Sequence, residues 1–129
     1  MKLLKCTVCQ DVYELTLGKG NCIPTCCGKE MRVLKAGEVD AAAEKHVPAV
    51  SQDGNLLKVV VGDVAHPMLE KHYITAIWVE YADGTVDKKT LIPDTAPEAV
   101  FDVTGKAGNA TVYEYCNLHG LWKKEFVIE

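Results

Sequence analysis

Most of the chain carries short runs of alternating apolar and polar residues, the pattern typical of β-strands with one buried face. Residues 72–81 place Tyr73, Thr75, Ile77, Val79 and Tyr81 on one side, and 56–61 is a Val- and Leu-rich run that ends at Gly62. An Asp83-Gly84 turn follows the long run and predicts a hairpin whose second strand is 85–92. Further strands are expected at 99–104, 110–116 and 122–128.

The pattern contains little helix. Residues 36–48 form a connector with one short helical candidate at 39–45, and Pro48 closes it. Short strands at this spacing without a second helix favour an antiparallel β-sandwich. The fold class predicted is therefore all-β, with neither an internal repeat nor a low-complexity tract.

The first 35 or so residues differ from the rest because five of the six cysteines lie between positions 6 and 27. Tyr13, Leu15, Leu17 and Val33 can cover one side of a cluster but cannot form an independent core. So small a segment needs a staple, and a metal ion is the expected one.

Composition and charge narrow the function classes. A hydrophobic content of 48% and a charged content of 25% are ordinary for a globular protein. The net charge of −4 argues against nucleic acid as a partner and would repel an anionic substrate unless nearby basic residues attract it. The sequence has no apolar run of transmembrane length and no signal-peptide pattern at its start, so we expect a cytoplasmic protein with reduced thiols and no membrane partner.

The first candidate metal site consists of cysteines. Cys6 and Cys9 form a CxxC pair, and the adjacent Cys26 and Cys27 complete four thiolates that suit Zn²⁺ or a single iron. Neighbouring cysteines reach one ion only with an irregular backbone, unlike the paired CxxC of a zinc ribbon. A purely structural zinc knuckle stays open as an alternative, and Cys22 is interpreted as a free or accessory thiol.

The second candidate site uses all four histidines of the chain, His46, His66, His72 and His119, together with Cys116. Five such ligands overfill a structural tetrahedral zinc site, whereas imidazoles with one thiolate suit redox iron or copper. Four imidazoles in a square with an axial thiolate would leave the opposite position open to a small oxygen species.

Two other classes of protein could use the same residues. A blue-copper electron carrier would use Cys116, His119 and one upstream histidine, but Gly120, Leu121 and Trp122 stand where an axial methionine is expected. Met68 is interpreted as core packing. A zinc-stapled binding module would contain no redox-active metal, and buried tryptophans fit either alternative.

Five motifs of the chain closely resemble the desulfoferrodoxin family, and the N-terminal cysteines resemble its desulforedoxin-like module. The motifs are AAAEKHVP at 41–48, VAHPM at 64–68, EKHYI at 70–74, APEAVF at 96–101 and EYCNLHG at 114–120. The resemblance covers essentially the whole chain. It implies a desulforedoxin-like, rubredoxin-like iron module with four cysteine ligands at 1–36 and an immunoglobulin-like superoxide reductase domain of seven strands at 37–129.

The resemblance also implies roles for single residues. Cys6, Cys9, Cys26 and Cys27 would hold one iron, and His46, His66, His72, His119 and Cys116 would hold the second, catalytic iron. Glu44 matches a carboxylate that can occupy the open position, and Lys45 matches the residue that draws superoxide in and assists protonation. Lys71 is a further basic residue that we expect to contribute to this attraction.

The activity implied is the one-electron reduction of superoxide to hydrogen peroxide, with a rubredoxin-like protein as electron donor and a homodimer as the assembly. Dismutation of superoxide at the same iron stays open. One departure concerns the N-terminal module: the loop between Cys9 and Cys26 is one residue longer than the desulforedoxin spacing, and it contains Cys22.

Overall fold

The structure is a computed structural model that describes residues 1–39, 41–62 and 66–129, and only the backbone of Glu44. The chain divides into two compact units, Met1–Lys35 and Ala36–Glu129, and each is described by itself. Among the described residues no helix has the length and apolar character needed to cross a membrane.

The N-terminal unit consists of two small antiparallel sheets. Strand β1 (Lys2–Lys5) lies between β2 (Val12–Leu15) and β5 (Arg32–Val33), while β3 (Thr25–Cys26) pairs with β4 (Lys29–Glu30). Its apolar cluster consists of Leu4, Cys6 and Met31, with Cys26 and Val33 packed against it. The expected cover by Leu17 is wrong because this side chain is 86% exposed. The core is small and cysteine-rich, as expected for a segment that needs a staple.

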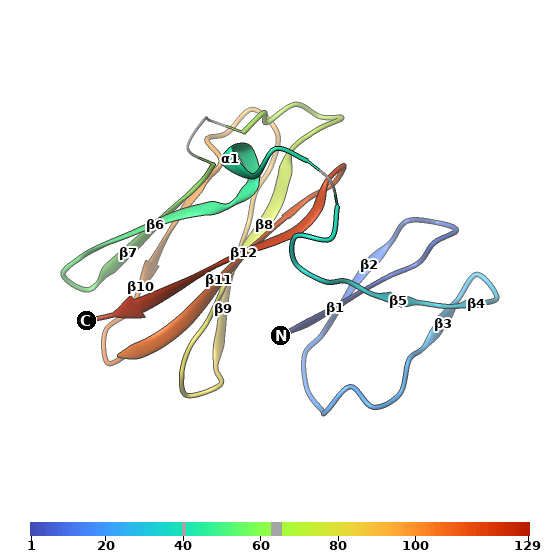
Figure 1. Cartoon of the computed structure of the whole chain (residues 1–129), viewed down its shortest axis with the longest axis horizontal. Helices are drawn as coiled ribbons and strands as arrows, with labels where there is room; N and C mark the ends of the chain where they lie inside the picture. The colour runs from blue at the N-terminus through green and yellow to red at the C-terminus, as the bar shows by residue number, and fades with distance from the viewer. Residues whose placement is uncertain (40, 63–65) are drawn as a thin grey trace. The chain divides into compact units, whose positions relative to one another are not determined.

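The C-terminal unit is an immunoglobulin-like antiparallel β-sandwich (Figure 1). One sheet has the order β10-β7-β6, with bounds Glu98–Asp102, Leu56–Val61 and Pro48–Asp53. The other has the order β12-β11-β8-β9, with bounds Gly120–Ile128, Gly108–Cys116, Ile74–Glu80 and Val86–Thr90. All pairings are antiparallel, as predicted from the alternating pattern.

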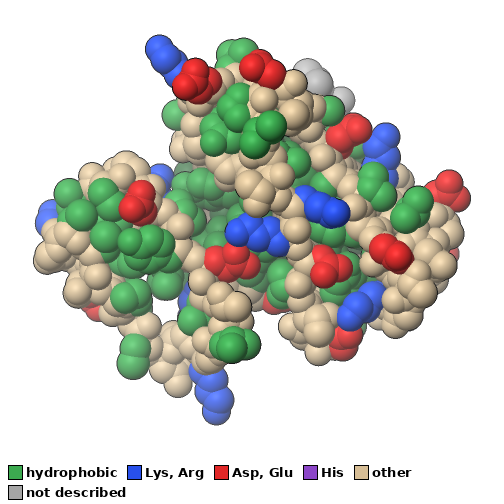
Figure 2. All heavy atoms as spheres, turned by 180° about the vertical axis from the view of Figure 1, so that it is seen from behind, with side chains coloured by type: hydrophobic (Ala, Val, Ile, Leu, Met, Phe, Trp, Pro, Cys, Tyr) green, Lys and Arg blue, Asp and Glu red, His purple; other side chains and the backbone are tan. Residues whose placement is uncertain are grey.

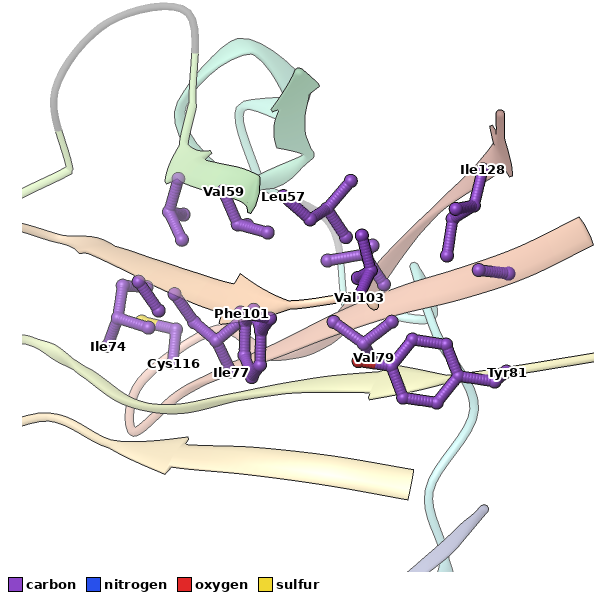
Figure 3. Packing of buried hydrophobic residues seen from close by; sticks show 14 of the residues in the cluster. Leu57, Val59, Ile74, Ile77, Val79, Tyr81, Phe101, Val103, Cys116 and Ile128 are labelled. Atoms are coloured by element: carbon purple, nitrogen blue, oxygen red, sulfur yellow. The ribbon is translucent and has the colours of Figure 1, made fainter. Parts of the chain in front are cut away.

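Apolar side chains from both sheets meet in one core. Leu57, Val59 and Phe101 come from the three-stranded sheet, and Ile77 and Val79 from the four-stranded sheet. Figure 3 shows the Cys116 sulfur beside Ile74, its partner in the β8–β11 pairing. The end of this core therefore provides one of the proposed ligands. Met68 belongs to the same core, as predicted.

Two local predictions differ from the structure. The helix α1 is a single turn, Ala43–His46, rather than 39–45, since Ala42 is extended (φ −67°, ψ 110°) and forms no side-chain cap. Strand β6 was not expected because only Val50 of its inward-facing residues Pro48, Val50 and Gln52 is a β-branched apolar residue. Its Asp53-Gly54 turn, with Gly54 at φ +60°, is nevertheless an ordinary hairpin signal.

Candidate metal centres

The histidines and Cys116 converge because strands and turns end together at one end of the sandwich. His46 is the last residue of α1, one residue before β6 begins, and His66 and His72 lie in the segment that leads into β8. Cys116 is the last residue of β11, and His119 directly precedes β12. One ligand atom from each of the five residues lies within 4.8 Å of all the others.

The four imidazoles form a closed square. Ring centroids are 4.8 Å apart for His46–His66, 4.8 Å for His66–His72, 4.9 Å for His72–His119 and 4.8 Å for His119–His46. Neighbouring rings are close to perpendicular, with interplanar angles of 74° to 88°. Cys116 Sγ lies 4.0 Å from His119 Nδ1 and comes from a fully buried residue. The arrangement points four ring nitrogens and one sulfur toward a common centre.

Hydrogen bonds to the outer ring nitrogens assign the tautomers of two histidines. His46 Nδ1 lies 2.8 Å from the Ala42 carbonyl oxygen, and His66 Nδ1 lies 2.7 Å from the Pro67 carbonyl oxygen. Each Nδ1 therefore carries the proton and donates it, which leaves Nε2 as a lone pair. The two Nε2 atoms are only 3.2 Å apart, and His46 Nε2 is 3.0 Å from His119 Nδ1.

Facing lone pairs at such distances repel one another unless a cation lies among them. A proton is a poor candidate, because burial lowers the pKa of His66 to about 4. Burial likewise lowers the pKa of His72, whose Nε2 is buried and has no hydrogen-bond partner among the described residues. Burial also raises the pKa of the Cys116 thiol, so its thiolate needs a cation nearby. Neutral imidazoles with one thiolate fit a redox metal such as iron.

Trp122 is a supporting residue that the sequence did not single out. Its indole ring stacks on His46 with centroids 5.1 Å apart, and its Nε1 donates a hydrogen bond of 3.0 Å to the His119 carbonyl oxygen. One side chain thus contacts the ring of His46 and the backbone of His119. Only its place two residues after Gly120 could have indicated this role.

The second group brings together the four predicted cysteines of the N-terminal unit. The sulfurs of Cys6, Cys9, Cys26 and Cys27 lie within 4.8 Å of one another, and no disulfide joins them. Cys9 Sγ is 3.8 Å from Cys26 Sγ, which is 3.9 Å from Cys27 Sγ. Cys27 adopts φ +54°, the irregular backbone expected for adjacent cysteine ligands.

Backbone donors prepare this group for a metal. The N–H groups of Cys9 and Val8 each lie 3.3 Å from Cys6 Sγ, and these hydrogen bonds lower the pKa of the Cys6 thiol to about 6. A thiolate is therefore favoured before any metal binds. Cys22 is an exposed free thiol that does not belong to the group of four sulfurs.

The two residues expected to act on the substrate lie on α1. Lys45 is exposed in the last position before His46, and its charge contributes to the lowered pKa of His72. The side chain of Glu44 lies outside the described part of the structure. On the face shown in Figure 2, basic and acidic side chains of the described residues are interspersed rather than gathered in a basic patch.

A sequence model of the family described as Desulfoferrodoxin matches residues 38–125. The desulfoferrodoxin of Nitratidesulfovibrio vulgaris is 48% identical over 126 residues, which are 96% of this chain and 95% of that protein. The superoxide reductase of Thermococcus kodakarensis is 36% identical over 114 residues, covering 76% of this chain and 97% of that protein.

The solved structures show the same likeness. The crystal structure of the superoxide reductase from Treponema pallidum superposes with a TM-score of 0.72 at 35% sequence identity. The match covers 94% of this chain and 98% of that one, so it extends over both units.

Proposed function

We infer the function of this chain from the family to which it belongs, the desulfoferrodoxins. We propose that it is a superoxide reductase, an oxidoreductase that reduces superoxide by one electron to hydrogen peroxide. The observation that carries this proposal is the closed square of four imidazoles completed by the buried Cys116. Relatives named superoxide reductase support it.

In this proposal His46, His66, His72, His119 and Cys116 hold a mononuclear iron. When bound, this iron supplies the electron and the coordination position for superoxide. The residues around it prepare the donor set: the Ala42 and Pro67 carbonyl oxygens hold two imidazoles in the tautomer that presents Nε2. Burial of Cys116 keeps water away from the sulfur.

Lys45 and Lys71 are proposed to attract the substrate. Both side chains are exposed and lie next to a histidine of the square in the sequence. Because the whole chain carries a net charge of −4, their local field must offset the general repulsion of an anion. Lys45 is also proposed to assist protonation of the product, and Glu44 to close the open position between turnovers.

The cysteine group of the N-terminal unit is proposed to hold a second iron in rubredoxin-like coordination. Four thiolates would equally accept Zn²⁺, so the family relationship is what favours iron here. We further propose a rubredoxin-like electron donor, a homodimer and a cytoplasmic location, where reducing conditions would keep the six cysteines from forming disulfides.

The blue-copper alternative receives no support from the geometry. Copper would leave two histidines of the square without a role, and the sulfur of Met68 accepts a hydrogen bond of 3.4 Å from the Ile74 N–H inside the core. A zinc-stapled binding module would not require four imidazoles and a cysteine with ligand atoms within 4.8 Å of one another.

The yield of hydrogen peroxide per superoxide consumed, measured with an electron donor in excess, tests the proposal. Reduction gives one peroxide per superoxide because one external electron is consumed each time. Dismutation gives one peroxide per two superoxides and consumes no donor. We expect the first yield, its loss in Cys116→Ser and its retention in Cys9→Ser. The yield of dismutation in the native protein would refute the reductase assignment.

A further inference from the structure

The β8–β11 ladder ends just where the histidine square begins. Strand β8 starts at Ile74 and β11 ends at Cys116, with a register shift between Tyr115 and Cys116. The Thr75 hydroxyl donates a hydrogen bond of 3.1 Å to the Tyr115 carbonyl oxygen at this irregularity. Beyond it, neither the chain around His72 nor the turn from Cys116 to His119 is held by strand pairing between β8 and β11.

Beyond the end of the ladder, hydrogen bonds from the side chain of Asn117 take the place of backbone pairing between the two segments. Its Oδ1 accepts a hydrogen bond of 2.9 Å from the Tyr73 N–H, and its Nδ2 donates one of 3.0 Å to the Lys71 carbonyl oxygen. The Asn117 N–H also donates to the Tyr73 carbonyl oxygen at 3.2 Å. One amide group therefore binds both peptide groups that flank His72, and it does so from the residue next to Cys116.

His72 depends on this support more than two of the other histidines do. The rings of His46 and His66 are each oriented by a hydrogen bond to a carbonyl oxygen. No such bond is found for the ring of His72 within the described part of the chain, and its Nε2 points into the square without a partner. The position of this imidazole therefore follows from its backbone. Leu69 also binds that backbone, through mutual hydrogen bonds of 2.9 Å with the N–H and the carbonyl oxygen of His72.

We propose that Asn117 is a positioning residue of the histidine and cysteine centre, coupling the place of His72 to the place of Cys116. It touches neither substrate nor metal and acts through the peptide groups on either side of His72. This inference rests on the proposed function insofar as the bound metal is iron, but the coupling itself concerns the geometry of the donor set.

The test uses the full-length protein with both metal groups loaded with iron. Asn117→Leu keeps the approximate size of the side chain without its amide, and Asn117→Ala removes it, so that one variant is available if the other folds poorly. Asn109→Ala replaces an exposed asparagine on β11, the strand that precedes Asn117, and is the matched control. The cysteine centre of each protein serves as an internal reference.

Two quantities are measured for each centre: the rate of iron release to a chelator and the position of the thiolate-to-iron charge-transfer absorption. Supporting residues around metal ligands typically change metal affinity by about 10–100-fold. We expect roughly tenfold faster release and a displaced absorption band at the Cys116 centre only, with both unchanged in Asn109→Ala. A purely structural role would accelerate loss from the centre without displacing the band.

Unchanged release, an undisplaced band or equal loss of iron from both centres would overturn the inference. The proposed function fails separately: the native protein would then bind iron and respond to Asn117 substitution as expected, yet produce peroxide only in the yield of dismutation.

Discussion

Glu114 offers a test of how the core beneath the histidine square is built. Its side chain is fully buried on the face of β11 that also carries Val112 and Cys116, and it lies opposite Ile77 and Trp122 in the neighbouring strands. Neither carboxyl oxygen has a hydrogen-bond partner among the described residues. Burial accordingly raises the pKa of Glu114 well above its ordinary value.

The magnitude follows from the cost of an unsatisfied buried polar group, which mutational data put at about 1–3 kcal/mol. Glu114→Leu removes both oxygens and keeps a side chain of comparable size. We therefore expect the free energy of unfolding to increase by about 1–3 kcal/mol. For a domain of this size each 1 kcal/mol corresponds to about 4–8 °C in Tm, so thermal unfolding of the iron-loaded protein resolves the change.

The pH dependence of the free energy of unfolding gives a second, independent test of the buried Glu114 carboxyl group. The folded state keeps the Glu114 proton to higher pH than the unfolded state does, so this group makes stability fall as the pH rises above 4.5, the ordinary pKa of a glutamate. Glu114→Gln should lack this fall between about pH 5 and pH 8, relative to the exposed control Glu98→Gln. A lower Tm for Glu114→Leu, or an unchanged pH slope for Glu114→Gln, would refute the reasoning. The first result would mean that the Glu114 carboxyl group contributes net stability, and the second that its pKa is not raised in the folded state.

Three further predictions concern charges and thiols. Lys45→Ala should slow the reaction with superoxide by roughly tenfold at low ionic strength and flatten its salt dependence, whereas Lys58→Ala should do neither, as stopped-flow kinetics would show. Cys22→Ser should leave the iron content and thiolate absorption of the cysteine centre unchanged, since this sulfur lies outside the group of four; loss of iron would contradict that. The hydrogen bond from Lys106 holds the pKa of Asp83 well below its ordinary value. Asp83→Asn should therefore lower Tm at neutral pH, by a difference that narrows below about pH 4; a difference independent of pH would exclude this ion pair as its cause.

The strands of the sandwich could largely be predicted because their alternation is local. The apolar run that ends at Gly62 is strand β7, and the two runs on either side of the Asp83-Gly84 turn form the β8–β9 hairpin. The alternating pattern placed Thr75 on the same side as Ile77 and Val79. At the start of β8, however, Ile74 is buried and Thr75 is only half-buried, because the register shift beside Cys116 inverts the alternation there. A β-bulge depends on the neighbouring strand, so the sequence of β8 alone does not reveal it.

The two sets of metal ligands could be recognised because few residue types bind a metal ion. In this chain all the histidines and five of the six cysteines lie in a few short motifs. The groups that orient these ligand side chains could not be recognised from the sequence. The carbonyl oxygens that orient His46 and His66 belong to Ala42 and Pro67, and a backbone oxygen leaves no trace in the identity of a residue. Trp122 and Asn117 act across strand ends that only the folded sheets bring together. The sequence can therefore identify the ligands of such a centre, but the rigidity of the centre, on which its redox behaviour depends, is a property of the sheet ends around it.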